Sequence, residues 1–388
     1  MTTPTYSTQF VPGLADVVAA QTHLSSVNGL DGELVIAGFP VQELASQATF
    51  EEVAYLLWND ALPTSVELAE FRQALASQRK LRRATVDVLR AAAQVRLPLM
   101  DALLLAASTL SLDLAKSEPP HQAVAVLARF PVIVATYARL LNDQNLLSPR
   151  EDLGQAANYL YMLFGEVPHP EQVRGLETYL NTVVDHGLNA STFTARVIIS
   201  TGSDLVSAVV GAMGALKGPL HGGAPGPALD MVFEIGEASR AETIMRQKLE
   251  RRERLMGFGH RVYRTRDPRA EVLSVAAEKM FCQSGNLTLY TLAREVENVA
   301  VRLLAERYPE RNLKTNVEFY TALLLNGLGF STDLFTPTFA ISRVAGWIAH
   351  ILEQRQQSRI IRPQSEYIGA RDRGWIPLQQ RQPMESVR

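Results

Sequence analysis

Two histidines in the second half of the chain lie on glycine-rich loops. His221 belongs to the run Gly218 to Gly223, and His260 belongs to the run Gly257 to Arg261. Glycine lets the main chain approach a ligand closely, because it has no side chain to interfere. An arginine, Arg269, follows the second run. Two imidazoles and a guanidinium in this order indicate a site for an anionic carbonyl compound.

Helix-start signals position two side chains that could take part. Asp267 followed by Pro268 predicts an N-cap and a first helical residue, which places Arg269 in the first turn. The exposed N–H groups and the guanidinium there favour a carboxylate ligand. Asn316 predicts a second N-cap, with Glu318 in the first turn of its helix.

A carboxylate, two imidazoles and several arginines are the groups needed to remove a proton next to a carbonyl and to stabilise the enolate. Glu318 would be the base, one imidazole would hydrogen-bond the oxyanion, and the other would polarise an acceptor carbonyl. Each residue alone also has an ordinary explanation, because a glutamate in a first turn often only complements the helix dipole. Taken together, the residues indicate an enzyme that acts on a carboxylated carbonyl compound.

Composition limits the class of protein. With 388 residues, 47% of them apolar, the chain can bury a large core, and a length of roughly 100 to 200 residues per domain predicts two or three domains. The 38 Lys and Arg residues balance the 40 Asp and Glu residues. The charge therefore favours neither nucleic acid nor a membrane surface as a partner. With one cysteine and no His-x-x-x-His pair, no metal site is expected.

Two further features predict a cytoplasmic protein. The single Cys282 excludes an intramolecular disulfide, which is typical of a reducing compartment. Arg72 is the first basic residue, so the cationic start of a secretory signal is missing. The most apolar stretch, Ala123 to Leu141, contains Arg129 and Pro131. Since an arginine at the middle of a bilayer costs at least ~2.5 kcal/mol, we expect a buried helix pair there and no membrane span.

The elements that must position these residues are mostly helices. Turn signals precede the β-branched run Glu33 to Phe39, which predicts a small β-ribbon. Apolar residues at helical spacing dominate the rest of the chain. The run Leu205 to Leu216 predicts a helix rich in small residues that packs closely on another helix. The partner helix is either one of the same chain or one of a second subunit. Thr336 and Pro337 predict the start of an apolar helix that contains Arg343.

Five runs of the sequence resemble motifs of the citrate synthase family, in the family's order and separation. They are Asp185 to Thr192, Gly218 to Gly223, Gly257 to Arg269, Asn316 to Tyr320 and Arg359 to Pro363. The resemblance begins near Val11 and covers nearly the whole chain.

This resemblance implies an all-α, multi-helical fold of two domains with a small N-terminal β-ribbon. Residues 1–221 and 332–388 would form the large domain, which carries the oxoacid site and the homodimer contact. Residues 222–331 would form the small domain, which binds CoA. The implied reaction condenses acetyl-CoA with oxaloacetate to citrate and CoA, through an enolised thioester and hydrolysis of citryl-CoA. Acetyl-CoA is then a co-substrate, and no tightly bound cofactor is implied.

The resemblance also implies roles for single residues. His221 would support the enol of the acyl-CoA, His260 would polarise the ketone of the oxoacid, and Glu318 would take the α-proton. The carboxylates of the oxoacid and product would be held by His186, Arg269, Arg343 and Arg362, the last reaching the partner subunit's site. CoA would be bound by Met256, Gly257, Phe258, Arg264 and Lys314, and Asn189 and Ser191 would support the site.

Two positions depart from the family's pattern. Glu318 replaces the family's aspartate, and Ala224, Pro225 and Gly226 stand where Ala-Asn-Glu or Ala-Asn-Gln is common. Both changes resemble a secondary branch that includes minor citrate synthases and 2-methylcitrate synthases. Two alternatives therefore stay open: a 2-methylcitrate synthase that uses propionyl-CoA, and a weakly active regulatory paralogue that binds CoA or oxoacid.

Overall fold

The architecture is given by a computed structural model, which describes residues 10–221, 225–259, 263, 265–284, 287–357 and 359–381. The chain divides into two units, one of residues 20–361 and one of residues 1–19 and 362–388. The described part of the second unit has no α-helix and no strand. It contains the single 3-10 turns η1 (Pro12–Leu14) and η4 (Leu378–Gln380).

A small antiparallel sheet opens the larger unit, as the sequence predicts. Its strands β1 (Ser25–Asn28), β2 (Glu33–Ile36) and β3 (Phe39–Pro40) lie in chain order. Leu34 and Ile36 are buried, because alternate side chains of a strand point to the same face. The turn before β2 uses Gly32 at a φ of 71°, a conformation that glycine adopts without strain.

Helices make up the rest of this unit. The first are α1 (Val41–Gln47), α2 (Phe50–Asn59), α3 (Ser65–Gln78), α4 (Arg83–Gln94), α5 (Leu99–Ser108), α6 (Ser111–Leu114), α7 (Pro119–Leu141), α8 (Gln155–Phe164) and α9 (Pro170–Val183). They continue with α10 (Ala190–Ser200), α11 (Leu205–Leu216), α12 (Pro225–Ile235), α13 (Ala238–Glu250), α14 (Pro268–Ser284), α15 (Thr288–Arg307), α16 (Val317–Gly327) and α17 (Phe335–Gln356), with short turns η2 (Pro309–Arg311) and η3 (Thr332–Leu334). The prediction of a mostly helical fold is confirmed.

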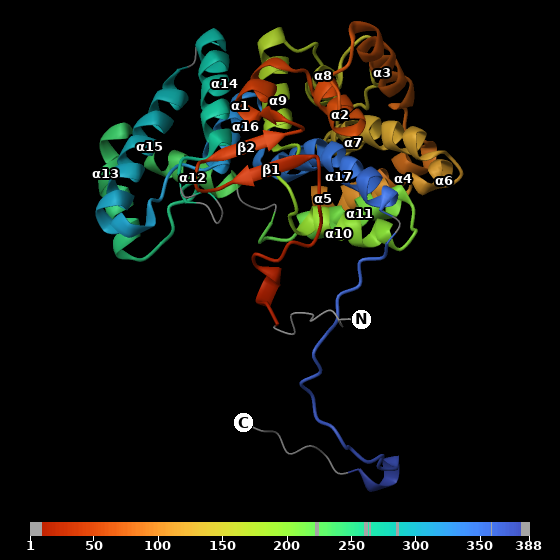
Figure 1. Cartoon of the computed structure of the whole chain (residues 1–388). Helices are drawn as coiled ribbons and strands as arrows, with labels where there is room; N and C mark the ends of the chain where they lie inside the picture. Colours follow the sequence, from red (N-terminus) through yellow and green to blue (C-terminus); the bar gives the residue numbers. More distant parts are fainter. Residues whose placement is uncertain are drawn as a thin grey trace. The chain divides into compact units, whose positions relative to one another are not determined.

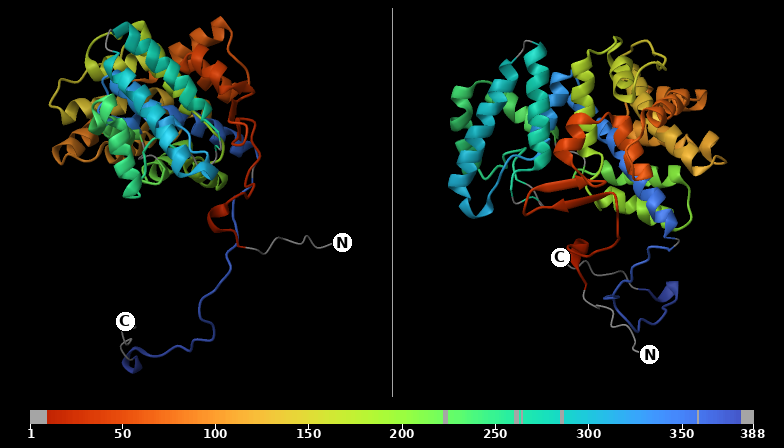
Figure 2. Two further views of the ribbon diagram at one scale, coloured as in Figure 1. Left: turned by 90° about the vertical axis from the view of Figure 1, so that its left-hand side faces the viewer. Right: turned by 45° about the horizontal axis from the view of Figure 1, so that its top comes forward.

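Two helices connect the sides of the larger unit. Figure 1 shows α12 to α15 gathered on one side, α3 and α4 on the other, and α9 and α17 between them. The right-hand view of Figure 2 shows the same grouping. On α17, a Cβ at Gly346 would collide with the carbonyl oxygen of Val184. This close approach holds α17 against the segment that follows α9, where the first of the five motifs begins.

The expectation of a helix pair at 123–141 is wrong, because α7 continues unbroken through Pro131. Proline has no N–H, so it cannot bond to the carbonyl four residues earlier. That carbonyl, of Leu127, instead accepts from the Gln155 side chain at 3.1 Å. By length and composition α7 could span a membrane, but 78% of its apolar window is buried in the fold. Inside the fold, Arg129 donates to the carbonyl oxygen of Gln78 at 2.9 Å.

Candidate functional site

The segment 257–259 pairs with the segment 314–316, which brings two of the motifs together. Gly259 N donates to Lys314 O at 2.7 Å, and Asn316 N donates to Gly257 O at 2.9 Å. Gly257 has a φ of 85°, and a Cβ there would lie 2.9 Å from the Cβ of Phe319. Only glycine fits this position, and the glycine-rich loop therefore lies against the first turn of α16.

Asp267 ties the starts of α14 and α16 to each other. Its carboxylate accepts from the backbone N of Arg269 at 3.0 Å and from the guanidinium of the same residue at 2.8 Å. It also accepts from the backbone N of Val317 at 3.2 Å. The predicted N-caps Asp267 and Asn316 are confirmed, since Asn316 Oδ1 accepts from Glu318 N at 3.0 Å. Arg269 and Glu318 are thus held at the first turns of two adjacent helices.

The turn that carries Glu318 is held by a buried glutamate that no local sequence pattern indicates. Glu297, on α15, accepts from the hydroxyl of Thr315 at 2.6 Å and from the hydroxyl of Tyr320 at 2.5 Å. Arg294 donates to the same carboxylate at 2.7 Å and to the Tyr320 oxygen at 2.7 Å. One carboxylate therefore fixes the chain on both sides of Glu318.

Arg343 is a buried cation whose hydrogen-bonding capacity is mostly unused. Its Nε donates to the carbonyl oxygen of Val183 at 2.8 Å, and its guanidinium lies 4.9 Å from the ring centre of Phe339. Within the described residues, neither Nη nitrogen has a hydrogen-bond partner. Burial lowers the pKa of Arg343 to about 10, so the group stays charged at neutral pH. A buried charged fork of this kind is suited to an anion that supplies two oxygens.

Electrostatic effects place the predicted residues in one neighbourhood. Burial, and then the charges of Arg343 and Arg269, lowers the pKa of His186 well below its ordinary value. Burial, and then the charge of Arg343, also lowers the pKa of His221. Burial raises the pKa of Glu318, while Arg269 opposes that shift. Both imidazoles are therefore neutral near pH 7. His186 lies near the charges of Arg343 and Arg269, and His221 lies near that of Arg343.

A hydrogen-bond chain fixes the ring of His221. Asn189 Oδ1 accepts from the backbone N of Ser191 and of Thr192, each at 3.1 Å, which identifies it as the amide oxygen. The Ser191 hydroxyl donates to the same oxygen at 2.7 Å. Trp347 Nε1 donates to that hydroxyl oxygen at 3.1 Å. The Ser191 oxygen also lies 2.8 Å from His221 Nε2. The contact with Ser191 thus fixes the orientation of the His221 ring through Nε2.

Asp185, beside His186, belongs to a second buried chain. Because a guanidinium can only donate, the contact of 2.8 Å between Arg196 Nη1 and His350 Nδ1 makes that nitrogen an acceptor. The proton therefore sits on Nε2, which donates to Asp185 Oδ1 at 3.1 Å. Although burial raises the pKa of Asp185, the contacts with His350 and the charge of Arg343 lower it overall. No local pattern in the sequence indicates this role of His350, because its partners lie far away along the chain.

Other predicted residues are placed less directly. Met256 and Phe258 lie on the loop that pairs with Lys314, and the rings of Phe258 and Phe319 are 5.3 Å apart. Lys314 lines a cavity of about 490 Å³. Arg362 is exposed and begins the second part of the other unit. His260 and Arg264 lie outside the described residues. In the part of the chain that is described, no cluster of three or more His, Cys, Asp or Glu side chains could hold a metal ion.

The sequence is similar to known enzymes over nearly its whole length. Residues 13–364 match the family described as citrate synthase, C-terminal domain. The chain is 40% identical over 375 residues to citrate synthase 2 of Bacillus subtilis, with 95% of this chain and 98% of that protein covered. It is 37% identical over 373 residues to 2-methylcitrate synthase of Shewanella oneidensis, with 95% and 97% covered.

Solved structures give the same result. Citrate synthase from Pyrobaculum aerophilum superposes with a TM-score of 0.86 at 38% identity, with 95% of each chain covered. The ternary complex of carboxymethyl coenzyme A and oxaloacetate with citrate synthase from Thermoplasma acidophilum gives a TM-score of 0.84 at 29% identity, with 94% of this chain and 98% of that one covered. The sequence motifs, the helical fold and these relatives agree, and the chain belongs to the citrate synthase family.

Proposed function

We propose that this protein condenses acetyl-CoA and oxaloacetate, with water, to citrate and CoA. The observation that carries the proposal is Arg343, whose buried guanidinium has two nitrogens without a partner among the described residues. His186 and Arg269 lie in the same electrostatic neighbourhood. Together they form a receptor for a small dicarboxylate, and oxaloacetate is bound beside a CoA analogue in the relative from Thermoplasma acidophilum.

The oxoacid would be held by charge and polarised by a neutral imidazole. Arg343, Arg269 and His186 bind its carboxylates, and Arg362 of a second subunit completes the set. His260 donates a hydrogen bond to the ketone oxygen and so increases the positive character of the carbon that is attacked.

Proton removal from the thioester would be the task of Glu318. Burial raises the pKa of this carboxyl group, which makes the carboxylate a stronger base while Arg269 limits the shift. His221, whose ring is held through Nε2 by the Ser191 hydroxyl, would support the enol of the acyl-CoA. The enol carbon then attacks the ketone, and water cleaves the citryl thioester.

CoA would be bound by the loop 256–258 with Arg264 and Lys314. We place this loop and Glu318 on a small domain of residues 222–331, which closes over a large domain of residues 1–221 and 332–388. Closure would exclude water until the carbon–carbon bond has formed.

A dimer would complete the protein, and we place it in the cytoplasm. Leucines that are exposed near α5 and α11 support a subunit contact, among them Leu105, Leu112 and Leu220. A second copy that packs on α5 and α11 would cover these side chains.

A 2-methylcitrate synthase is the second candidate, favoured by the relative from Shewanella oneidensis. Its substrate, propionyl-CoA, differs by one methylene, which a pocket discriminates by only ~1 to 3 kcal/mol. Glu318 stands where the family's pattern has aspartate, which resembles a secondary branch that includes 2-methylcitrate synthases. The same residue motivates a third candidate, a weakly active regulatory paralogue that binds CoA or oxoacid.

Free-thiol release from acetyl-CoA and from propionyl-CoA, each with oxaloacetate, tests these proposals. We expect the higher kcat/KM with acetyl-CoA, and the reverse order would establish the second candidate. Glu318→Gln should lower kcat by at least about 10²-fold, because the amide cannot accept the proton. Glu318→Asp should retain turnover. An active Gln variant would remove Glu318 from the mechanism, and CoA binding without any turnover would support the regulatory paralogue.

A further inference from the structure

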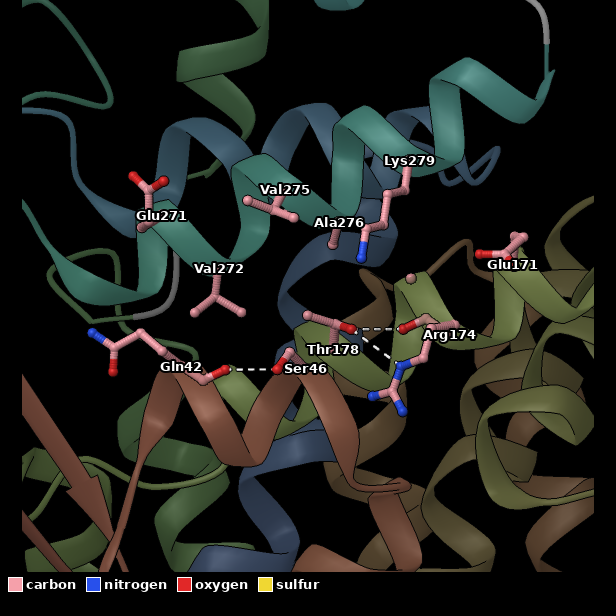
Figure 3. Close-up of a pocket in the computed structure, with 11 residues that line it drawn as sticks. Gln42, Ser46, Glu171, Arg174, Thr178, Glu271, Val272, Val275, Ala276 and Lys279 are labelled. Carbon is pink, nitrogen blue, oxygen red and sulfur yellow. Dashed lines mark hydrogen bonds between the residues drawn. The ribbon is translucent and has the colours of Figure 1, made fainter.

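A cavity lies between α1, α9 and α14, apart from the residues assigned to the reaction. Its volume is about 230 Å³, enough for a molecule of modest size, since an apolar cavity of about 150 Å³ already holds benzene. One wall is apolar and consists of Val272, Val275 and Ala276 of α14. Figure 3 shows these side chains facing the space between α14 and the two helices below it.

One end of the cavity carries Lys279, an exposed cation, and the carboxylate of Glu171 belongs to the same lining. The Lys279 ammonium group points into the space beneath α14 (Figure 3), and it forms no salt bridge with any described residue. Glu271 at the opposite end bonds to Arg266 at 2.7 Å and points away from the cavity in Figure 3. Arg174 is occupied, because it donates to the carbonyl oxygen of Ala48 at 2.8 Å and to two other carbonyls at the end of α1.

The helices that enclose the cavity also carry the oxoacid site. α9 ends at Val183, whose carbonyl binds Arg343, and the chain then leads to His186. α14 begins at Pro268, and Arg269 lies in its first turn. The distance between these two helices therefore sets the distance between the two guanidinium groups. Binding of a dianion would draw those groups together, whereas an occupant of the cavity would resist the approach of α14 to α9.

We propose that this cavity binds a small monocarboxylate with a short apolar chain, whose carboxylate pairs with Lys279, and that its occupant weakens oxaloacetate binding. Such an occupant matches the apolar wall and the unpaired ammonium group. Because allosteric coupling is reciprocal, oxaloacetate must weaken its binding by the same factor. The coupling to oxaloacetate rests on the proposed function, whereas binding of the monocarboxylate does not.

Binding is tested with hexanoate and its neutral analogue hexanamide, by ligand-observed NMR titration of the full chain. We expect hexanoate to bind the unaltered protein and Lys279→Met to weaken it by about tenfold, the factor that corresponds to loss of one partly exposed ion pair. Hexanamide should bind weakly to both. Lys116→Met, which removes another exposed lysine, is the matched control and should bind hexanoate normally. Equal affinity of hexanoate for the Lys279→Met and Lys116→Met variants would overturn the proposal.

Kinetics separate this site from the substrate site. Hexanoate should raise the KM for oxaloacetate in the unaltered enzyme and in Lys116→Met, with little effect in Lys279→Met. Val275→Trp should fill the cavity, abolish hexanoate binding and itself raise this KM by about threefold or more, a coupling within the usual range. Circular dichroism checks that this variant is folded. Inhibition that persists unchanged in Lys279→Met would mean that hexanoate binds the substrate site. If the protein has no condensation activity but still binds hexanoate through Lys279, the proposed function is refuted. The assignment of a monocarboxylate to the cavity would still stand.

Discussion

At the scale of single residues, a change at Glu297 should most clearly separate the positioning of Glu318 from the binding of oxaloacetate. Its carboxylate holds Thr315 and Tyr320 on either side of Glu318. Replacing Glu297 by Gln puts an NH2 group opposite one of these two hydroxyls, because the amide has a single acceptor oxygen. It also removes the negative charge that pairs with Arg294. We expect kcat to fall by about 10²-fold, the loss typical of a base displaced by roughly 1 Å. The KM for oxaloacetate should change little, because Glu297 touches none of the arginines assigned to it.

Glu295→Gln is the control, since Glu295 is exposed on the same helix. Steady-state thiol release and thermal unfolding are measured for both variants. A Glu297→Gln enzyme with a normal kcat and a lowered Tm would show that the contacts of Glu297 with Thr315 and Tyr320 only stabilise the fold. A combined variant with Tyr320→Phe should lose no more than either change alone, because both break one network.

Residue-scale prediction from the sequence succeeded where the signal was local. The N-caps at Asp267 and Asn316 placed Arg269 and Glu318 correctly in first turns, because a cap and its helix are adjacent in sequence. Glu297 was missed, since an acidic residue within a helix looks like any solvated charge. Its partners are brought to it by packing between helices, which no spacing rule records.

At the scale of elements, the contact between α2 and α9 should respond to pH. Glu177 on α9 is buried beside Glu51 of α2. Burial, and then the charge of Glu51, raises the pKa of Glu177 from 4.5 to about 7. Since the folded state binds this proton more tightly than the unfolded state, the stabilisation is complete below 4.5 and is lost as the pH rises through about 7. The amount lost is on the order of 3 kcal/mol.

Glu177→Gln should therefore flatten the pH dependence of unfolding and raise the Tm at about pH 8, where the native carboxylate is charged. The amide keeps an oxygen for the backbone N–H of Phe50, from which Glu177 accepts. Unfolding followed by circular dichroism from about pH 5 to about pH 8 measures the effect. Glu166→Gln, at an exposed position, serves as the comparison. A lower Tm for Glu177→Gln at every pH would show that its pairing with Arg174 outweighs the cost of burying the charge.

Element-scale prediction worked for helix ends and failed inside a helix. The sequence predicted that Pro131 divides 123–141 into two helices, because proline removes a hydrogen bond. The structure shows one helix, since the Gln155 side chain takes the place of the missing donor at Leu127. A compensating contact from another helix cannot be seen in a local pattern.

At the scale of the whole molecule, the resemblance of five separated motifs was more informative than periodicity. Periodicity indicated many helices but not their packing, whereas the order of the motifs implied one known arrangement. The confirmed fold includes the junction of loop 257–259 with Asn316 and its helix. Subunit assembly depends on surfaces that face another molecule. Substitutions on α11 test whether this helix forms such a surface.

Two glycines of α11 differ in what surrounds them within one chain. A Cβ at Gly211 would collide with Ile198 of α10, whereas a Cβ at Gly214 would meet nothing within 4 Å. In a lone subunit, Gly214→Ala should therefore raise stability by roughly 0.5 to 1 kcal/mol, because alanine favours the helix. In a dimer that packs α11 against a second copy, the added methyl group would push the helices apart.

We expect Gly214→Ala to weaken the dimer, so that sedimentation velocity detects monomer at concentrations where the unaltered protein is dimeric. The Tm of this variant should fall on dilution, since subunit association stabilises the folded chain by mass action. Gly211→Ala is the control: its Cβ meets the end of the Ile198 side chain within the subunit, so its effect on the Tm should not depend on concentration. A Gly214→Ala protein that stays dimeric and melts higher would show that α11 faces solvent. The proposed assembly, in which Arg362 reaches a neighbouring site, would then need a different surface.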